Sequence, residues 1–269
     1  MDGPPTATND IALSADARRV LSAGHNGKLQ LWDTGTGECL HVMFASTHGA
    51  TSARFYDGGR RALAAVNEKL QFWDLADGRL LRTIEKCGLA HSIWVSSDER
   101  VAATVGRSNK IMLWNLRGKR RLRVLEGPDE RVTSASMSAD GRSVVACARG
   151  NIRLWEIASG QCVQVLEHPG HPMHARLSPD GRSVLSADDD ARLRVWDVPS
   201  GRLLRALETH QGRPVGLAFA PDGDFALSAG SDGTVQRWEF DWELSVPADS
   251  GSDRHRARLG TVLSRMWRR

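Results

Sequence analysis

The feature that most constrains the fold is a tryptophan that recurs at an almost constant interval along the chain. Successive members of this series are 41, 41, 41, 41 and 42 residues apart. They are Trp32, Trp73, Trp114, Trp155, Trp196 and Trp238. Such regularity does not arise by chance, so the chain consists of repeats of about 41 residues. A unit this short cannot bury both of its faces alone, and we expect neighbouring repeats to stack on one another.

Each of these tryptophans ends a segment in which apolar and polar residues alternate. The segments are KLQLW, KLQFW, KIMLW, NIRLW, RLRVW and TVQRW. A period of two predicts a β-strand. Turns such as SADG and SPDG, and further strand-like segments such as SVLSA and RLLRAL, recur around it. The sequence therefore predicts an all-β fold with about four short strands per repeat.

Composition agrees with a packed globular protein. Hydrophobic residues make up 41% and charged residues 25% of the 269 residues. The four cysteines are far apart and form no CxxC pair, which favours reduced thiols over a disulfide framework or a zinc site. The opening MDGPPTATND does not resemble a secretory signal, and no apolar run is long enough for a membrane helix. We therefore expect a cytoplasmic location.

The dipeptide Trp-Asp at residues 32, 73 and 196, with the repeat length and the turns, resembles the WD-repeat β-propeller family, and the turns and ending resemble its bacterial members. The resemblance implies a β-propeller with buried hydrogen-bonded sets within blades, and the six repeats of this chain are counted as six four-stranded blades. Two repeats carry the whole set, as His168, Ser186, Asp190 and Trp196, and as His210, Ser228, Asp232 and Trp238. The expected blades span about residues 8–46, 47–87, 88–128, 129–168, 169–210 and 211–247.

Closure of the expected ring is left open by the sequence. Family members most often have seven blades and complete the last one with an N-terminal strand. Here the first strand is expected at about residues 8–13, which leaves too short a lead, while residues 242–246 supply a local outer strand. The alternatives are a closed six-bladed ring, an open ring completed by another chain, or a fragment of a longer propeller.

A basic tail follows a linker at residues 248–253. Residues 252–269 hold six arginines and one aspartate. Apolar residues at 259, 262, 263, 266 and 267 follow a helical period, which predicts a basic amphipathic helix over 254–269. This helix is expected to cap the propeller, to enter a groove of a partner protein, or to bind an anionic membrane or nucleic acid.

Two motifs resemble catalytic or metal sites. The Ser, His and Asp of each complete set look like a hydrolytic triad, but the sets occupy the same place in two repeats and lack a GxSxG turn, so we interpret them as structural. The histidines of HPGHPMH, residues 168–174, need not converge and lack a fourth ligand. We therefore expect no catalytic residue, metal or cofactor. Trp94, on an innermost strand, is interpreted as packing rather than as part of an interaction surface.

The family resemblance implies a non-enzymatic platform that presents propeller loops to a protein or peptide partner, with no small-molecule substrate. Predicted partner-binding residues in the turns before the tryptophan strands are His25, Arg107, Arg149 and Asp188. Those in the loops between blades are Asp129, Arg131, His171 and Arg213. The alternative function is association with nucleic acid or an anionic membrane through residues 254–269.

Overall fold

The computed structural model describes residues 7–47, 49–106, 110–126, 132–148, 150–220 and 222–241, and the backbone of residues 258–262. Within these ranges the chain forms only strands and turns, arranged as six four-stranded antiparallel sheets. The all-β prediction is confirmed. Among the described residues, no helix is long and apolar enough to cross a membrane. The chain divides into two compact units, residues 1–132 and 133–269.

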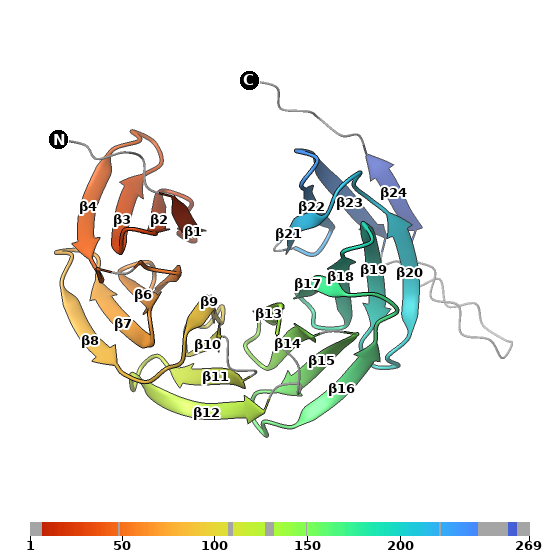
Figure 1. The fold of residues 1–269 in the computed structure, drawn as a ribbon, viewed down its shortest axis with the longest axis horizontal. Coiled ribbons are helices and arrows are strands. Elements are labelled where there is room, and N and C mark those ends of the chain that lie inside the picture. Colours follow the sequence, from red (N-terminus) through yellow and green to blue (C-terminus); the bar gives the residue numbers. More distant parts are fainter. Residues whose placement is uncertain are drawn as a thin grey trace, which may run out of the picture. The chain divides into compact units, whose positions relative to one another are not determined.

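The first unit contains three sheets, in each of which a strand pairs with the next one along the chain (Figure 1). The first sheet is β1 (Thr8–Leu13), β2 (Arg19–Gly24), β3 (Lys28–Asp33) and β4 (Cys39–Phe44). The second is β5 (Ser52–Tyr56), β6 (Arg61–Val66), β7 (Lys69–Asp74) and β8 (Leu80–Ile84). The third is β9 (Ala90–Val95), β10 (Val101–Gly106), β11 (Lys110–Asn115) and β12 (Arg120–Glu126).

The second unit repeats this architecture with the fourth, fifth and sixth sheets of the chain. The fourth sheet is β13 (Ser134–Met137), β14 (Ser143–Ala148), β15 (Asn151–Glu156) and β16 (Cys162–Glu167). The fifth is β17 (Pro172–Leu177), β18 (Ser183–Asp188), β19 (Arg192–Asp197) and β20 (Leu203–Glu208). The sixth is β21 (Pro214–Phe219), β22 (Phe225–Gly230), β23 (Val235–Asp241) and β24 (Arg258–Val262).

All six repeat tryptophans lie on the third strand of their sheet. Each is opposite a small or β-branched residue of the second strand, namely Val20, Ala62, Ala102, Val144, Val184 and Ala226. In the first five sheets an irregularity in pairing with the fourth strand falls at the tryptophan. The constant spacing therefore places each indole in the same position of its sheet.

Within each unit, the face of a sheet that carries the tryptophan covers the preceding sheet. In the first unit, Trp73 packs with Leu21 and Leu31 of the first sheet. In the second unit, Trp238 packs with Leu185 and Val195 of the fifth sheet. A buried indole of about 200 Å² contributes about 5 kcal/mol by its area, so this packing is a main source of stability.

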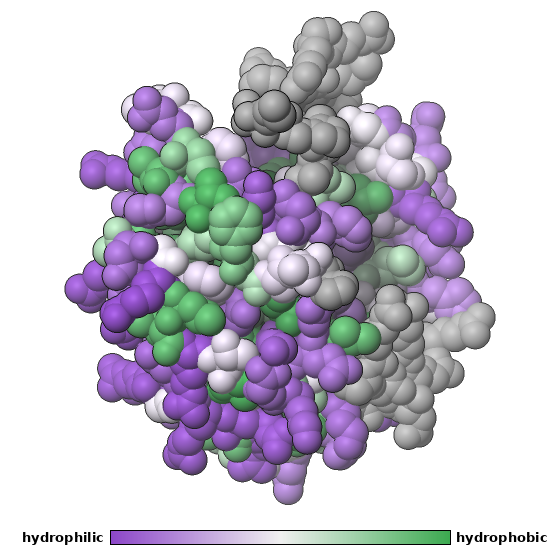
Figure 2. Space-filling view, turned by 60° about the vertical axis from the view of Figure 1, so that its left-hand side comes forward, coloured by the Kyte–Doolittle hydropathy of each residue, from purple (hydrophilic) through white to green (hydrophobic). Residues whose placement is uncertain are grey.

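Apolar side chains of the first sheet remain exposed on its tryptophan-bearing face. Ile11 is 66%, Leu13 63% and Phe44 72% exposed, and Trp32 is only partly buried. Figure 2, in which the left-hand side of Figure 1 comes forward, shows green apolar patches among hydrophilic residues. This face lacks the cover that the second and third sheets receive inside the first unit.

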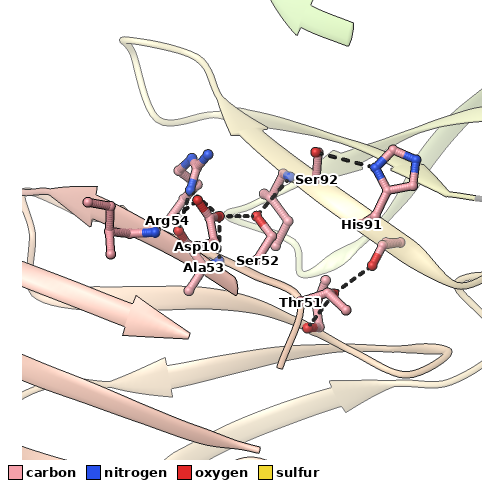
Figure 3. A network of polar contacts seen from close by, with 11 residues as sticks. Asp10, Thr51, Ser52, Ala53, Arg54, His91 and Ser92 are labelled. Carbon is pink, nitrogen blue, oxygen red and sulfur yellow. Dashed lines mark hydrogen bonds and ion pairs between the residues drawn. The ribbon is translucent and has the colours of Figure 1, made fainter. Parts of the chain in front are cut away.

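Within each unit, the first strands of neighbouring sheets lie side by side and are joined by polar side chains. The hydroxyl of Thr51 donates to the carbonyl oxygens of Ala65 in its own sheet and Ala90 in the next (Figure 3). The hydroxyl of Thr133 does the same with Cys147 and Pro172 in the second unit. Adjacent sheets of a unit therefore share hydrogen bonds as well as an apolar interface.

The carboxylate of Asp10, on β1, joins the first sheet to the second. Asp10 Oδ2 lies 2.6 Å from the hydroxyl of Ser52 and 2.6 Å from Arg54 Nη1 (Figure 3). The oxygen of Ser52 also accepts the backbone N–H of Ile93, in the third sheet, at 3.1 Å. One serine hydroxyl thus connects all three sheets of the first unit.

The end of the chain differs from the sequence prediction. The fourth strand of the last sheet is β24, residues 258–262, paired antiparallel with β23. These residues lie in the segment predicted to be a helix, so for them the helix prediction is wrong. The open edge of β23 offers backbone hydrogen bonds, and Gly260 disfavours a helix. The proposed outer strand at 242–246, the linker and the remainder of 254–269 lie outside the described residues.

Replacement of Leu185 by alanine tests how much packing between sheets contributes. Leu185 is fully buried between the fifth and sixth sheets, whereas Leu227 has the equivalent register position in the sixth sheet and is 39% exposed. We expect Leu185→Ala to lower the free energy of unfolding by about 2–5 kcal/mol in urea denaturation. The matched Leu227→Ala change should cost clearly less, and equal losses would contradict the packing described here.

Candidate functional site

In the sixth sheet the predicted polar set forms a continuous chain of hydrogen bonds. The indole N–H of Trp238 donates to the oxygen of Ser228 at 2.9 Å, and this oxygen lies 2.8 Å from His210 Nε2. His210 Nδ1 lies 2.9 Å from the hydroxyl of Thr234, which itself donates to Asp232 at 2.7 Å. Because the Thr234 proton goes to the carboxylate, His210 donates through Nδ1, and in the neutral ring Nε2 then accepts from Ser228. The sequence prediction missed Thr234 as the intermediate group.

In the fifth sheet the same set is bonded in the opposite direction. The backbone N–H of Gly170 donates to His168 Nδ1 at 3.1 Å, so the ring proton is on Nε2. His168 Nε2 then donates to the oxygen of Ser186 at 3.2 Å, which also accepts the indole N–H of Trp196 at 2.9 Å. Asp190 takes no part in this chain and is instead bonded to Arg194 Nη2 at 3.3 Å.

A buried ion pair explains why the fifth sheet differs. Arg194 forms an ion pair with Asp188, and the two side chains are 4% and 0% exposed. The same guanidinium also forms an ion pair with Asp190, and in the described part of the chain Asp190 has no hydrogen bond to the histidine. In the sixth sheet the equivalent residues are Gly230 and Gln236, and the aspartate stays with its histidine.

The burial of these groups also sets their protonation. Burial, together with the positive charge of Arg194, lowers the pKa of His168 to about 4. The hydroxyl of Thr234 is the main cause that lowers the pKa of Asp232 to about 2. At neutral pH the fifth-sheet histidine is therefore an uncharged structural group, and the aspartate of the sixth sheet is ionised.

The serines of these sets are poorly placed for nucleophilic catalysis. A serine nucleophile transfers its proton to a histidine base and needs access to substrate. Ser186 instead receives protons from both His168 and Trp196, and it is fully buried. Ser228 lies 2.8 Å from His210 Nε2, as a nucleophile would, but it is 1% exposed and its oxygen also accepts an indole N–H, so a substrate has no access to it. Both sets join strands of one sheet through buried hydrogen bonds.

The other sheets retain only part of this arrangement. Trp32 donates to the hydroxyl of Ser22 at 3.0 Å, and Trp114 donates to Thr104 at 2.9 Å. In the second sheet Ala64 has the equivalent register position. The buried indole N–H of Trp73 has no hydrogen-bond partner among the described residues.

The predicted partner-binding residues fall into three groups. His25, His171 and Arg213 are exposed in loops at the ends of strands. Asp188 is buried in its ion pair with Arg194 and is not available to a partner. Arg107, Asp129, Arg131 and Arg149 lie outside the described residues. Trp94 is partly exposed on β9, opposite Ala103.

Within the second unit, two of the exposed residues lie at equivalent places. The carbonyl of His171 accepts the N–H of Asp189 at 3.3 Å, and the carbonyl of Arg213 accepts the N–H of Ser231 at 2.8 Å. The loop before the first strand of a sheet is thus tied to the turn before its tryptophan strand. Each exposed side chain is presented on a fixed backbone.

Sequence reasoning missed a polar cavity at the opposite ends of the strands in the first unit. Its volume is about 380 Å³, and it is lined by Arg19, Asp57, Arg60, Arg61, Asp74 and Ala76. The signal that could have revealed it is the doubled arginine at 18–19 and 60–61, where other repeats have one arginine or none.

Comparison with known proteins decides the family. The family model described as "WD domain, G-beta repeat" matches residues 2–33, 119–156, 160–197 and 201–239, which is more than half of the chain. The chain belongs to the WD-repeat family. The WD repeats at residues 34–118 are not matched, although the sheets there have the same strand order and tryptophan position. No curated protein matches the chain.

A serine at position 64 should supply the acceptor that Trp73 lacks. We expect Ala64→Ser to raise the free energy of unfolding by about 1 kcal/mol, because WD repeats one, five and six have serine at this register position. The control is Ala65→Ser, which places a hydroxyl in the apolar cluster on the other face of the strand and should destabilise. Thermal or urea unfolding of both variants checks this, and a loss with Ala64→Ser would contradict it.

The ion pair of the fifth WD repeat can be exchanged for the residues of the sixth. Asp188→Gly and Arg194→Gln should each destabilise by about 3 kcal/mol or more, because each leaves a buried charge without its partner. The double variant should lose less than the sum, with a coupling of about 1–3 kcal/mol. Urea unfolding of the four proteins measures the coupling, and additive losses would show that the pair is not energetically linked.

Proposed function

We propose that this protein is a non-enzymatic platform for protein–protein interaction that presents strand-end loops to a protein or peptide partner. WD repeats generally have this role, and the family membership is the observation that carries the proposal. In this proposal the six sheets are the blades of one propeller, as the resemblance to the family implies. Four free cysteines support a reducing compartment, and we place the function in the cytoplasm.

The distribution of burial supports loop-based recognition. The strands carry the buried residues and the structural polar sets, whereas His25, His171 and Arg213 are exposed at strand ends. The turns before the tryptophan strands also differ between repeats in length and charge. A rigid frame with variable, polar ends suits selective binding of moderate affinity.

The test is affinity capture with the full chain and a loop variant. The loop variant carries His25→Ala, His171→Ala and Arg213→Ala. A matched control removes exposed residues at the other strand ends, with Arg100→Ala, Arg142→Ala and Arg182→Ala. We expect that some proteins are recovered with both the wild type and the control, and that their recovery falls at least tenfold with the loop variant. Equal recovery with the wild type and the loop variant would contradict the role of these loops.

Association with nucleic acid or an anionic membrane through the tail is the alternative, supported by its six arginines. Deleting the tail would also remove β24 and confuse binding with folding. Arg265, Arg268 and Arg269 lie beyond β24, so their replacement by glutamine is the cleaner change. Salt-dependent binding to DNA, RNA or anionic vesicles that is lost in this variant would favour the alternative.

A further inference from the structure

The turn between the first two strands has one form in four of the sheets. A serine hydroxyl donates to the aspartate two residues later, whose carboxylate accepts the backbone N–H of the arginine that follows. These serine–aspartate pairs are Ser14 and Asp16, Ser96 and Asp98, Ser138 and Asp140, and Ser178 and Asp180. The carboxylate is therefore used to close its own turn.

The second sheet departs from this form. Its turn runs Tyr56, Asp57, Gly58 and Gly59, so the carboxylate is moved by one residue. The N–H of Gly58 donates instead to Glu99 of the neighbouring turn, at 2.7 Å. Gly58 and Gly59 both have positive φ, a conformation that favours glycine. Because glycine has no side chain, this part of the surface stays open. A Cβ at Gly59 would lie 2.9 Å from Arg19 Nη2.

The departure coincides with additional positive charge. The second strand begins with Arg19 in the first sheet and Arg61 in the second. The other sheets begin it with an uncharged residue, namely Val101, Ser143, Ser183 and Phe225. Both of the additional arginines line the cavity of about 380 Å³ in the first unit. Two independent changes in the repeat thus converge on one site.

The carboxylates of the cavity leave one guanidinium available. Asp57 lies 3.7 Å from Arg60 and 3.4 Å from Arg61, and Asp74 accepts the N–H of Ala76 at 3.0 Å. Arg19 lies over the ring of Phe55, 5.9 Å from its centroid. Among the described residues, no carboxylate lies within ion-pair distance of Arg19. The aromatic contact therefore holds an arginine that has its charge free for a ligand.

We propose that this cavity binds a carboxylate side chain of an acidic peptide segment, with Arg19, unpaired among the described residues, as its main cationic contact and Arg61, which it would share with Asp57, as the second. Three guanidinium groups and two carboxylates leave a net charge of +1, which a single carboxylate neutralises, whereas a doubly charged phosphate would leave an excess negative charge in the cavity. The volume is at the small end for ligand pockets and suits one or two side chains. The inference rests on the proposed role in protein binding and adds a second surface, at the strand ends opposite to the predicted loops.

Fluorescence anisotropy with the full chain tests this proposal. The probe is a labelled peptide Gly-Ser-Glu-Glu-Ser-Gly, compared with its glutamine and phosphoserine analogues at the two central positions. The variants are Arg19→Val and Arg61→Ser, which carry residues that other repeats have at these positions. The control is Arg142→Ser, which removes one exposed arginine from the equivalent turn of the fourth sheet.

We expect the glutamate peptide to bind the wild type and the control equally, and the two cavity variants at least tenfold more weakly. Unchanged binding by the cavity variants, no saturable binding to the wild type, equal binding of the glutamine peptide or preference for phosphoserine would each overturn the proposal. Far-UV circular dichroism of all variants establishes that they are folded. If affinity capture succeeds while the peptide fails, the cavity proposal is wrong and the platform proposal stands.

Discussion

The structure depends on the contact between the tryptophan-bearing face of one sheet and the opposite face, without the tryptophan, of the sheet before it. A four-stranded sheet of this size carries apolar side chains on both faces, and each contact between two sheets buries one face of each. The same contact recurs from sheet to sheet within each unit. The indole is the largest group in each interface, which explains why its spacing is the most regular feature of the chain.

Hydrogen bonding refines this packing and is less uniform. Four of the indoles reach a hydroxyl on the neighbouring strand, but the groups beyond that hydroxyl differ. His210 donates a hydrogen bond to Thr234, which is bonded to an aspartate, whereas His168 donates to the serine of its set. The difference lies in the neighbouring residues. In the fifth sheet Arg194 pairs with Asp188 and Asp190, whereas the sixth sheet has glutamine and glycine at the positions of Arg194 and Asp188.

Much of the fold could be predicted from the sequence because it follows from short-range patterns. Alternation gives the strands, and the 41-residue interval gives the equivalent positions of the tryptophans. The histidine and serine of each complete set were also predicted. The burial of Asp188 was not, because in the sequence it is one of three consecutive aspartates and only Arg194 distinguishes it. The tail strand was missed because an apolar period of a few residues also fits an edge strand, and pairing with β23 decides between them.

The hydroxyls of Thr51, Ser52 and Thr133 join backbone and side-chain atoms about one repeat apart in the chain. The two threonines bond to backbone carbonyls, which every repeat offers whatever its side chains are. The serine instead needs a carboxylate, and the register position that is Asp10 in the first sheet is Ser52 itself in the second. The threonine links therefore tolerate substitution in the neighbouring sheet, whereas the serine link is particular to one pair of sheets.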